Sequence, residues 1–365
     1  MSFSAISLNR SFYEDLDLYD NVRANDWQDI TFGRTGHTFS HNVNINGGSE
    51  TIKYAFSYAH MNDKAIMIGS NYKRDNLSLK LNTKPTKNTT LDFQARYSET
   101  DIRGGGANDA TSSYDSDKRL KYSVIYTPIP LKNLTSDEGS ADDDLGNLYH
   151  PVTSVWDNDR KQERKNLNLA GSFGWEIFKN FKVKTEFGYD DYKNFDQRFW
   201  GLTTYYIKNV PSSENQGLPA IQLADQNRHR FRNTNTISYD FKKIFGKESP
   251  HSLNVMVGHE YVITKQRTDT DIAHGFPENY TAEDAWKLTN QGTPYQIQDY
   301  FYPDDKLLSY FGRANYNFMD KYLLSATFRA DASSKFNKSN RWGELSSGPR
   351  RMNSVQSKTS STWRS

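Results

Sequence analysis

The stretch "TLDFQARYSE", residues 90–99, alternates between apolar and polar side chains along its length. An extended chain turns successive side chains to opposite faces, so a period of two predicts a β-strand with one apolar face. The apolar face would carry Leu91, Phe93, Ala95 and Tyr97. The opposite face would carry Asp92, Gln94, Arg96 and Ser98, with both signs of charge in mid-strand. Such a strand needs an apolar environment on one side and a wet one on the other.

The same alternation recurs along most of the chain and predicts about ten strands in total. The other nine lie at residues 43–45, 54–58, 76–82, 167–177, 181–189, 236–241, 252–263, 307–318 and 321–330. The connections between them alternate in length. Short ones such as "NGGSE" and "FKN" are followed by long ones such as residues 100–164 and 190–230. Tight turns at one end and long loops at the other are typical of an antiparallel, up-and-down transmembrane β-barrel.

This pattern makes specific predictions. "RLKYSVIYTPI", residues 119–129, would interrupt the alternation as a strand, so we place it in a long loop as a short helix or local hairpin. Segments 101–163, 197–229 and 266–305, with Trp156 and Trp286, should lie at one end of the sheet. The tight turns at Gly48, Asn180 and Asp320 should lie at the other.

In a barrel the apolar face meets lipid and the polar face meets a wet lumen. The period of two then assigns a direction to each side chain. The residues expected to point outward are Leu91, Phe93, Leu169, Val183, Val255 and Leu324. Those expected to point inward include Asp92, Lys184 and Asn254. Aromatic residues at the strand ends, among them Phe178, Phe181, Phe241, Phe245, Phe318 and Tyr322, predict girdles at the membrane interfaces. The alternative is a large soluble β-sandwich with an aromatic core.

Composition narrows the class of protein. Hydrophobic residues make up 35% of the 365 residues, yet aromatic residues make up 14%, which is unlike a disordered chain. A net charge of +2 gives no argument for nucleic-acid binding. The absence of cysteine excludes disulfides and thiolate chemistry. The sequence has no apolar run long enough for a membrane helix, and "MSFSAISLNR" lacks the features of a signal peptide.

Several stretches resemble one known family. "NDWQDITF" at residues 25–32, the segment from "HNVNINGGSE" to "LDFQARYS" at 41–98, and "LLSYFGRANYNF" to "KSNRWG" at 307–343 are similar to SusC/RagA-type TonB-dependent transporters. The resemblance implies a 22-stranded outer-membrane barrel with an N-terminal plug. It also implies a SusD-like lipoprotein partner, energy from the TonB complex, and import of oligosaccharides or peptides. The chain would then be a conduit and ligand-docking surface with no enzymatic activity and no cofactor.

The same resemblance predicts how the chain is divided. Residues 1–39 would be an extracellular loop region, 40–343 a partial barrel, and 344–365 a polar tail that is disordered or frameshifted. The family's signal peptide, TonB box and plug are not visible, so we interpret the chain as a barrel fragment that does not transport alone. The alternative function is a soluble or surface β-sheet adhesin with no transport role.

The long loops contain the candidate site residues. Aromatic rings can stack on ligands while polar neighbours fix their orientation. The rings predicted to bind ligand are Trp156, Trp200, Tyr205, Tyr206 and Trp286. The alternative for each ring is that it packs the loops against one another. Three consecutive carboxylates, Asp142, Asp143 and Asp144, form a weak calcium candidate whose spacing does not match an EF-hand. We find no catalytic residues and no histidine-based metal motif.

Overall fold

The computed structural model describes residues 23–104, 119–128, 150–204, 206–207, 217–241, 246, 249–319 and 321–347. The strands are β1 (His37–Gly48), β2 (Ile52–Lys64), β3 (Asn71–Thr86), β4 (Thr89–Arg103), β5 (Arg160–Phe178), β6 (Phe181–Trp200), β7 (Ala220–Asp240), β8 (His251–His274), β9 (Thr293–Ile297), β10 (Tyr300–Phe301), β11 (Asp305–Phe318), β12 (Tyr322–Ser333) and β13 (Trp342–Ser347). The helices are α1 (Trp27–Phe32), α2 (Arg119–Ile125), α4 (Pro151–Asp157) and α8 (Ala282–Lys287), with 3-10 turns η3 (Thr289–Gln291) and η4 (Lys338–Asn340).

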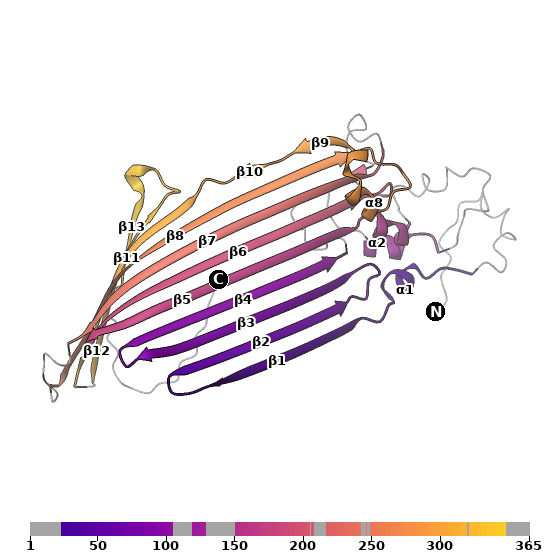
Figure 1. Cartoon of the computed structure of the whole chain (residues 1–365). Helices are drawn as coiled ribbons and strands as arrows, with labels where there is room; N and C mark the ends of the chain where they lie inside the picture. Colours follow the sequence, from indigo (N-terminus) through magenta and orange to yellow (C-terminus); the bar gives the residue numbers. More distant parts are fainter. Residues whose placement is uncertain are drawn as a thin grey trace, which may run out of the picture.

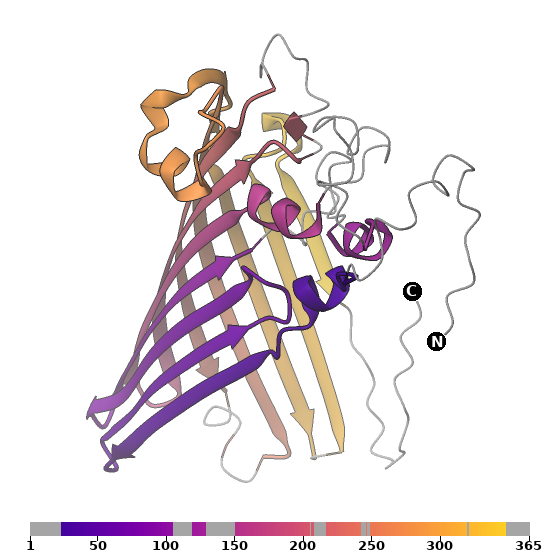
Figure 2. The same ribbon diagram turned by 90° about the vertical axis from the view of Figure 1, so that its right-hand side faces the viewer.

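All of these strands belong to one antiparallel sheet. Each strand lies beside the next in the chain from β1 to β8, and β11, β12 and β13 follow (Figure 1). The short strands β9 and β10 pair with β8 beyond the end of β11. The sheet is strongly curved (Figure 2). The ten strands predicted from alternation are therefore confirmed, and β9, β10 and β13 are additional.

The two ends of the sheet differ as expected. The tight turns after β1 and β5 lie at one end, where Gly48 and Asn180 have φ angles of 153° and 72°. Asparagine and glycine tolerate such positive values better than other residues. Because each strand reverses direction, the long connections all lie at the other end, and α4 with Trp156 and α8 with Trp286 are both there. Residue 320 lies outside the described residues, and α2 confirms that 119–125 is not a strand.

Strand length is the main difference from the prediction. β6, β7 and β8 contain 20, 21 and 24 residues, about twice the ~9–11 that a tilted strand needs to cross a bilayer. The segment 197–229, predicted as a loop, therefore contains strand at both of its ends, because β6 continues to Trp200 and β7 begins at Ala220. β13 likewise includes residues 344–347, the start of the predicted polar tail, whereas 348–365 lie outside the described residues.

The outward face of the sheet carries the predicted apolar residues. Leu91 lies opposite Phe173, and Val183 lies between Trp175 and Ile237 in the register. The same register puts the rest on this face: Phe93, Leu169, Val255 and Leu324. Leu91 and Phe93 are 40% and 41% exposed, and many other large apolar side chains of this face are also exposed. This is the reverse of a sandwich, in which such a face would be buried against a second sheet.

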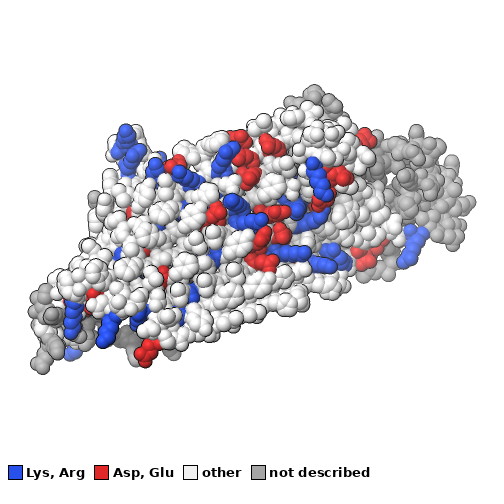
Figure 3. Space-filling view, viewed as in Figure 1, with Lys and Arg blue, Asp and Glu red and all other residues white. Residues whose placement is uncertain are grey.

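Beyond the apolar belt, towards the loop end, the outward face becomes charged. Figure 3 shows acidic and basic side chains gathered there, beside a large uncharged area. Several of these charges are paired, with Lys165 3.2 Å from Glu99, Lys161 3.1 Å from Glu163, and Arg267 2.6 Å from Asp269. The strands thus have an apolar half suited to lipid and a charged half suited to water.

Aromatic side chains mark the turn end of the apolar belt. Phe178 stacks on Phe181 with ring centroids 4.7 Å apart, and Tyr239 packs edge-on against Phe241 at the same distance. Phe318 lies 6.3 Å from Tyr322. These contacts confirm the grouping of rings at this end, as expected of an interfacial girdle. Phe245 lies outside the described residues.

The helices lie at the loop end. Figure 2 shows α1, α2 and α4 on the side of the strands opposite to α8. In the described ranges, each helix falls short of the length and apolar character required to cross a bilayer.

Candidate functional site

A row of polar residues crosses the inward face of the sheet at one height. Register places them side by side on β3 to β8, β11 and β12: Asn82, Asp92, Ser172, Glu186, Thr234, Glu260, Ser309 and Asp331. Asp92 was predicted to point inward, and its place in this row confirms the prediction. Lys184 and Asn254, predicted to share this face, also do so.

Several polar side chains of this row form hydrogen bonds or ion pairs with neighbouring inward-facing residues. The Ser172 hydroxyl donates to Asp92 Oδ2 at 2.8 Å, and the Thr234 hydroxyl donates to Glu260 Oε2 at 3.1 Å. Arg329 lies 3.1 Å from the other oxygen of Glu260. The carboxylates of this row are tolerated in mid-strand because they have hydrogen-bonding or ionic partners on the same or the adjacent strand and a wet face beside them.

Small residues hollow out the inward face near this row. Ala170 of β5 lies beside Gly188 of β6, and Arg232 of β7 extends over that glycine: a Cβ there would lie 3.5 Å from Arg232 Nε. A hollow of about 410 Å³ results, and its lining includes Lys80 and Lys184 as well as Ala170 and Arg232. The inward face is thus a polar, uneven wall on which a solute can rest.

Two of the predicted ligand rings form a packed pair. Trp200, at the end of β6, is only 4% exposed and stacks on Tyr206 with ring centroids 4.1 Å apart. The Arg198 guanidinium lies 5.0 Å from the Trp200 ring centre, and the Tyr206 hydroxyl lies 2.8 Å from His274 Nε2. These rings hold the ends of β6 and β8 together.

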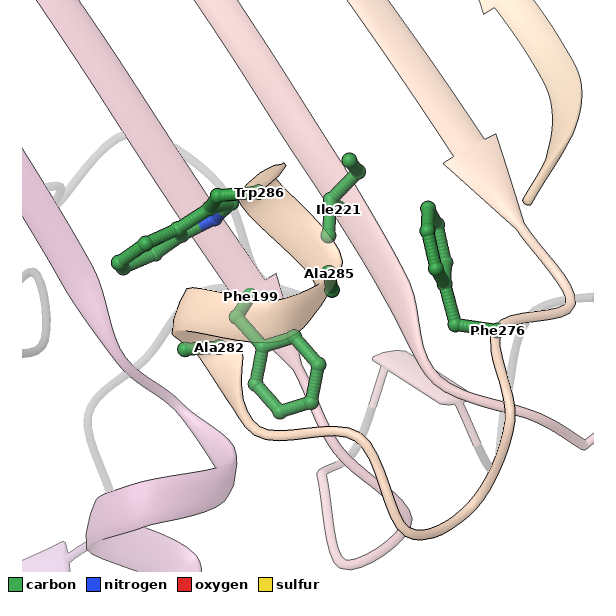
Figure 4. Packing of buried hydrophobic residues seen from close by; sticks show 6 residues of the cluster. All are labelled: Phe199, Ile221, Phe276, Ala282, Ala285 and Trp286. Atoms are coloured by element: carbon green, nitrogen blue, oxygen red, sulfur yellow. The ribbon is translucent and has the colours of Figure 1, made fainter. Parts of the chain in front are cut away.

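Trp286 lies in a separate cluster on the outward face. Its indole is 8% exposed and packs with Phe199, Ile221 and Phe276, under the short helix α8 (Figure 4). Alanine residues at 282 and 285 let the helix approach the strands closely. The connection between β8 and β9 is thereby fastened to β6 and β7.

The start of α8 is capped. The Thr281 side chain accepts from the backbone N–H of Asp284, and the Asp284 carboxylate accepts from the Thr281 hydroxyl and backbone, a capping box. These hydrogen bonds from Thr281, the side-chain one first, lower the pKa of Asp284 below its usual value. The cap therefore holds the helix at neutral pH.

Trp156 differs from the other predicted rings. It is 50% exposed on α4, beside Gly69 in the β2–β3 connection. The structure thus brings Trp200 and Tyr206 together but not Trp156 or Trp286 with them, and Tyr205 lies outside the described residues. Burial favours a packing role for Trp200 and Trp286, whereas Trp156 is the accessible ring. A ligand role for the set stays a prediction.

The calcium candidate Asp142, Asp143 and Asp144 lies outside the described residues. Within the described part of the chain, no cluster of three or more His, Asp or Glu residues is arranged to hold a metal ion.

Sequence reasoning missed the basic side of the inward wall. Arg228, Arg230 and Arg232 alternate in "RHRFR" and all face inward on β7, in register with inward residues of β6. The alternation was visible, but assigning residues up to 229 to a loop concealed it.

The fold and its surface define a class of protein, the transmembrane-type β-barrel, because polar residues face inward and exposed apolar residues face outward on long antiparallel strands.

Comparisons with known proteins narrow this class. The TonB-dependent receptor SusC of Bacteroides thetaiotaomicron is 25% identical over 341 aligned residues, covering 88% of this chain and 31% of the receptor. The TonB-dependent receptor P3 of Formosa agariphila is 24% identical over 363 aligned residues, covering 93% of this chain and 33% of that receptor. The chain thus spans about a third of the length of the curated relatives it matches. No family model matches it.

Solved structures agree on the fold. The RagAB peptide importer in its open-open state superposes with a TM-score of 0.68 at 18% identity, covering 94% of this chain and 39% of that one. In the closed-closed state the TM-score is 0.67 at 16% identity. The resemblance to SusC/RagA-type TonB-dependent transporters is confirmed, and the all-β, antiparallel barrel fold with it.

Proposed function

We propose that this chain forms part of the wall of a TonB-dependent importer in a bacterial outer membrane. It acts there as a conduit and ligand-docking surface for oligosaccharides or peptides and catalyses no reaction. The observation that carries the proposal is that apolar residues are exposed on the outward face of the sheet while polar residues line the inward face. Leu91 and Phe93 are exposed on the outward face, and Asp92 accepts a hydrogen bond from Ser172 on the inward face. Lipid stabilises the first face and a wet lumen stabilises the second.

The surface also separates this proposal from a soluble adhesin. A soluble protein rarely exposes apolar patches larger than a few hundred Å². Here the exposed apolar side chains continue from β1, with Val43 and Ile45, across to Leu324 and Phe328 on β12. Such a continuous belt in water would favour aggregation, whereas in a bilayer it is the expected exterior.

The proposal names three kinds of partner. Outer-membrane lipid contacts the apolar belt. A SusD-like lipoprotein docks at the loop end, and the TonB complex supplies energy from the periplasmic side. The similarity to receptors named as TonB-dependent supports the energy source, and the RagAB likeness supports a fold suited to import.

The test uses the protein as its own cell makes it. Uptake of a labelled panel of neutral oligosaccharides and peptides is measured in wild-type cells, in cells lacking this gene, and in cells lacking TonB. We expect at least one ligand to accumulate only when both are present, with the protein in the outer-membrane fraction. Recovery of the protein in the soluble fraction, or uptake that does not depend on it, would contradict the proposal.

A further inference from the structure

Resting on the proposed function, we propose that the inward wall around β7 selects acidic substrates, and that it binds an extended peptide with carboxylates on alternate residues.

The central feature is an arginine ladder on β7, formed by Arg228, Arg230 and Arg232. They occupy alternate positions of one strand, so all three face inward, and each is exposed on that face. Alternate residues of a strand are spaced by roughly 6.8 Å. At the end of the ladder nearer the turns, Arg232 lies over Gly188, which has no side chain, so the wall is recessed there.

Further arginines surround the ladder on the same face. Arg96 is in the row of Arg230, and Arg74 and Arg164 share a row four residues nearer the loop end. Arg74 and Arg96 line a hollow of about 360 Å³, together with Ser98, Asn168 and one carboxylate, Asp190. These side chains extend the positive wall from β3 to β7.

None of these six arginines has a carboxylate within ion-pair distance among the described residues. Those with close polar or aromatic neighbours contact neutral groups: Arg74 donates to Asn76 and Ser98, Arg164 donates to Gln162, Arg96 lies beside Gln94, and Arg228 lies 5.2 Å from the Tyr192 ring centre. These six arginines therefore form no ion pair with the described residues of the wall, where the nearest carboxylate in the register is Asp190, opposite Arg230.

The acidic residues of the wall are already engaged elsewhere. Asp190 accepts from Asn168, and Asp196 pairs with Arg160. Glu186 pairs with Lys184 at 2.8 Å. On the outward face at similar height Lys165 pairs with Glu99, whereas Lys193 and Lys265 have no carboxylate within ion-pair distance among the described residues. The inward face thus carries a closely spaced set of arginines that have no carboxylate within ion-pair distance among the described residues.

An extended acidic peptide fits this arrangement. Its side chains also alternate, so carboxylates on every second residue repeat with the same spacing of roughly 6.8 Å as the ladder. The guanidinium group is a planar fork that binds carboxylates in a bidentate manner. Each arginine of the ladder can then take one carboxylate of a single strand-like ligand.

The test measures binding to the protein purified in detergent from the outer membrane of its own cell. Calorimetry compares a nine-residue peptide of alternating Glu and Ser with the same peptide carrying Gln for Glu. The variant R228Q/R230Q/R232Q removes the ladder. The control K165Q/K193Q/K265Q removes three positive charges from the outward face at the same height.

We expect the acidic peptide to bind more tightly than the neutral one, and its affinity to fall as salt rises. The ladder variant should weaken acidic binding on the order of tenfold and leave neutral binding unchanged, whereas the control should match the wild type. Equal affinity for the two peptides, or unchanged acidic binding in the ladder variant, would overturn the inference.

Uptake separates this inference from the proposed function. If cells import neutral ligands through the protein with no preference for acidic ones, the acidic preference is wrong and the importer stands. If no ligand of either kind is imported, both fail.

Discussion

The indole Nε1–H of Trp286 on α8 donates to the backbone carbonyl of Arg198 on β6, at 3.2 Å. This hydrogen bond joins residues 88 positions apart and fixes the connection after β8 to a strand two places away in the sheet. A second link comes from Arg103 at the end of β4, which lies 3.1 Å from both Asp159 and Glu283. These contacts fix α8, and with it the connection after β8, to β6 and β4 at the loop end.

The first prediction concerns this tie. Trp286→Ala should loosen residues 275–292, because it removes a buried ring and its hydrogen bond; a large-to-small change of this kind costs about 3–5 kcal/mol. Hydrogen exchange on the membrane-embedded protein should show faster exchange there. Trp156→Ala is the control, since that ring is half exposed and should alter exchange little. Equal protection in both variants would show that the tie is unimportant.

The second prediction concerns the lipid face. Val183→Arg puts a charge on the outward face and should cost about 2–4 kcal/mol if the residue lies near the midplane of the bilayer. Asn254→Arg is the control, because Asn254 faces inward beside Asp240. Denaturant unfolding from liposomes measures both. Similar losses for the two variants would contradict the assignment of faces.

A third prediction concerns packing on the inward face. A Cβ at Gly258 would lie 2.7 Å from Phe311 Cζ and 2.7 Å from the Asn235 carbonyl oxygen. Gly258→Ala should therefore destabilise the protein by about 1–3 kcal/mol through overpacking. Gly312→Ala, where the nearest atoms lie at 3.6 and 3.7 Å, should be tolerated. Thermal unfolding in detergent compares them, and an equal effect would count against the close contact.

The fourth prediction concerns acid. Hydrogen bonds from Thr281 hold the pKa of Asp284 below its usual 3.8. A carboxylate with a lowered folded-state pKa contributes stability above its unfolded-state pKa, and this contribution is lost as pH falls through the folded-state value. The protection factor of the α8 amides, which is the intrinsic exchange rate divided by the measured one, should thus be unchanged from pH 7 to 5 and fall only below about pH 3.8. Asp284→Asn should lower the protection of α8 against exchange already at neutral pH. Equal protection of α8 in the variant and the wild type at every pH would contradict the role of the cap.

Much of the fold followed from the sequence because alternation is a local property. Leu91 to Tyr97 alternate so regularly that strand and face are set by adjacent residues alone. The halves of the strands nearer the loop end were missed because their outward face is also charged, as at Lys165 and Lys193. The alternation of apolar and polar residues therefore disappears there, although the strands continue.

The site was harder to predict for a related reason. The aromatic rings of the loops were visible, but their burial depends on partners distant in sequence, as with Trp286 and Ile221. The arginine ladder needed only the correct start of β7, whereas its lack of acidic partners becomes apparent only from the cross-strand register.

The most direct test of the central claim uses the absence of cysteine from the sequence. Single cysteines are placed at Asp92, Phe93, Val183 and Lys184 in the membrane-embedded protein and labelled with a nitroxide. The account predicts that residues 93 and 183 are accessible to oxygen dissolved in lipid, and that residues 92 and 184 are accessible to a water-soluble relaxation agent. If residues 93 and 183 were shielded from both agents, as in a closed core between two sheets, the membrane-wall account would be wrong.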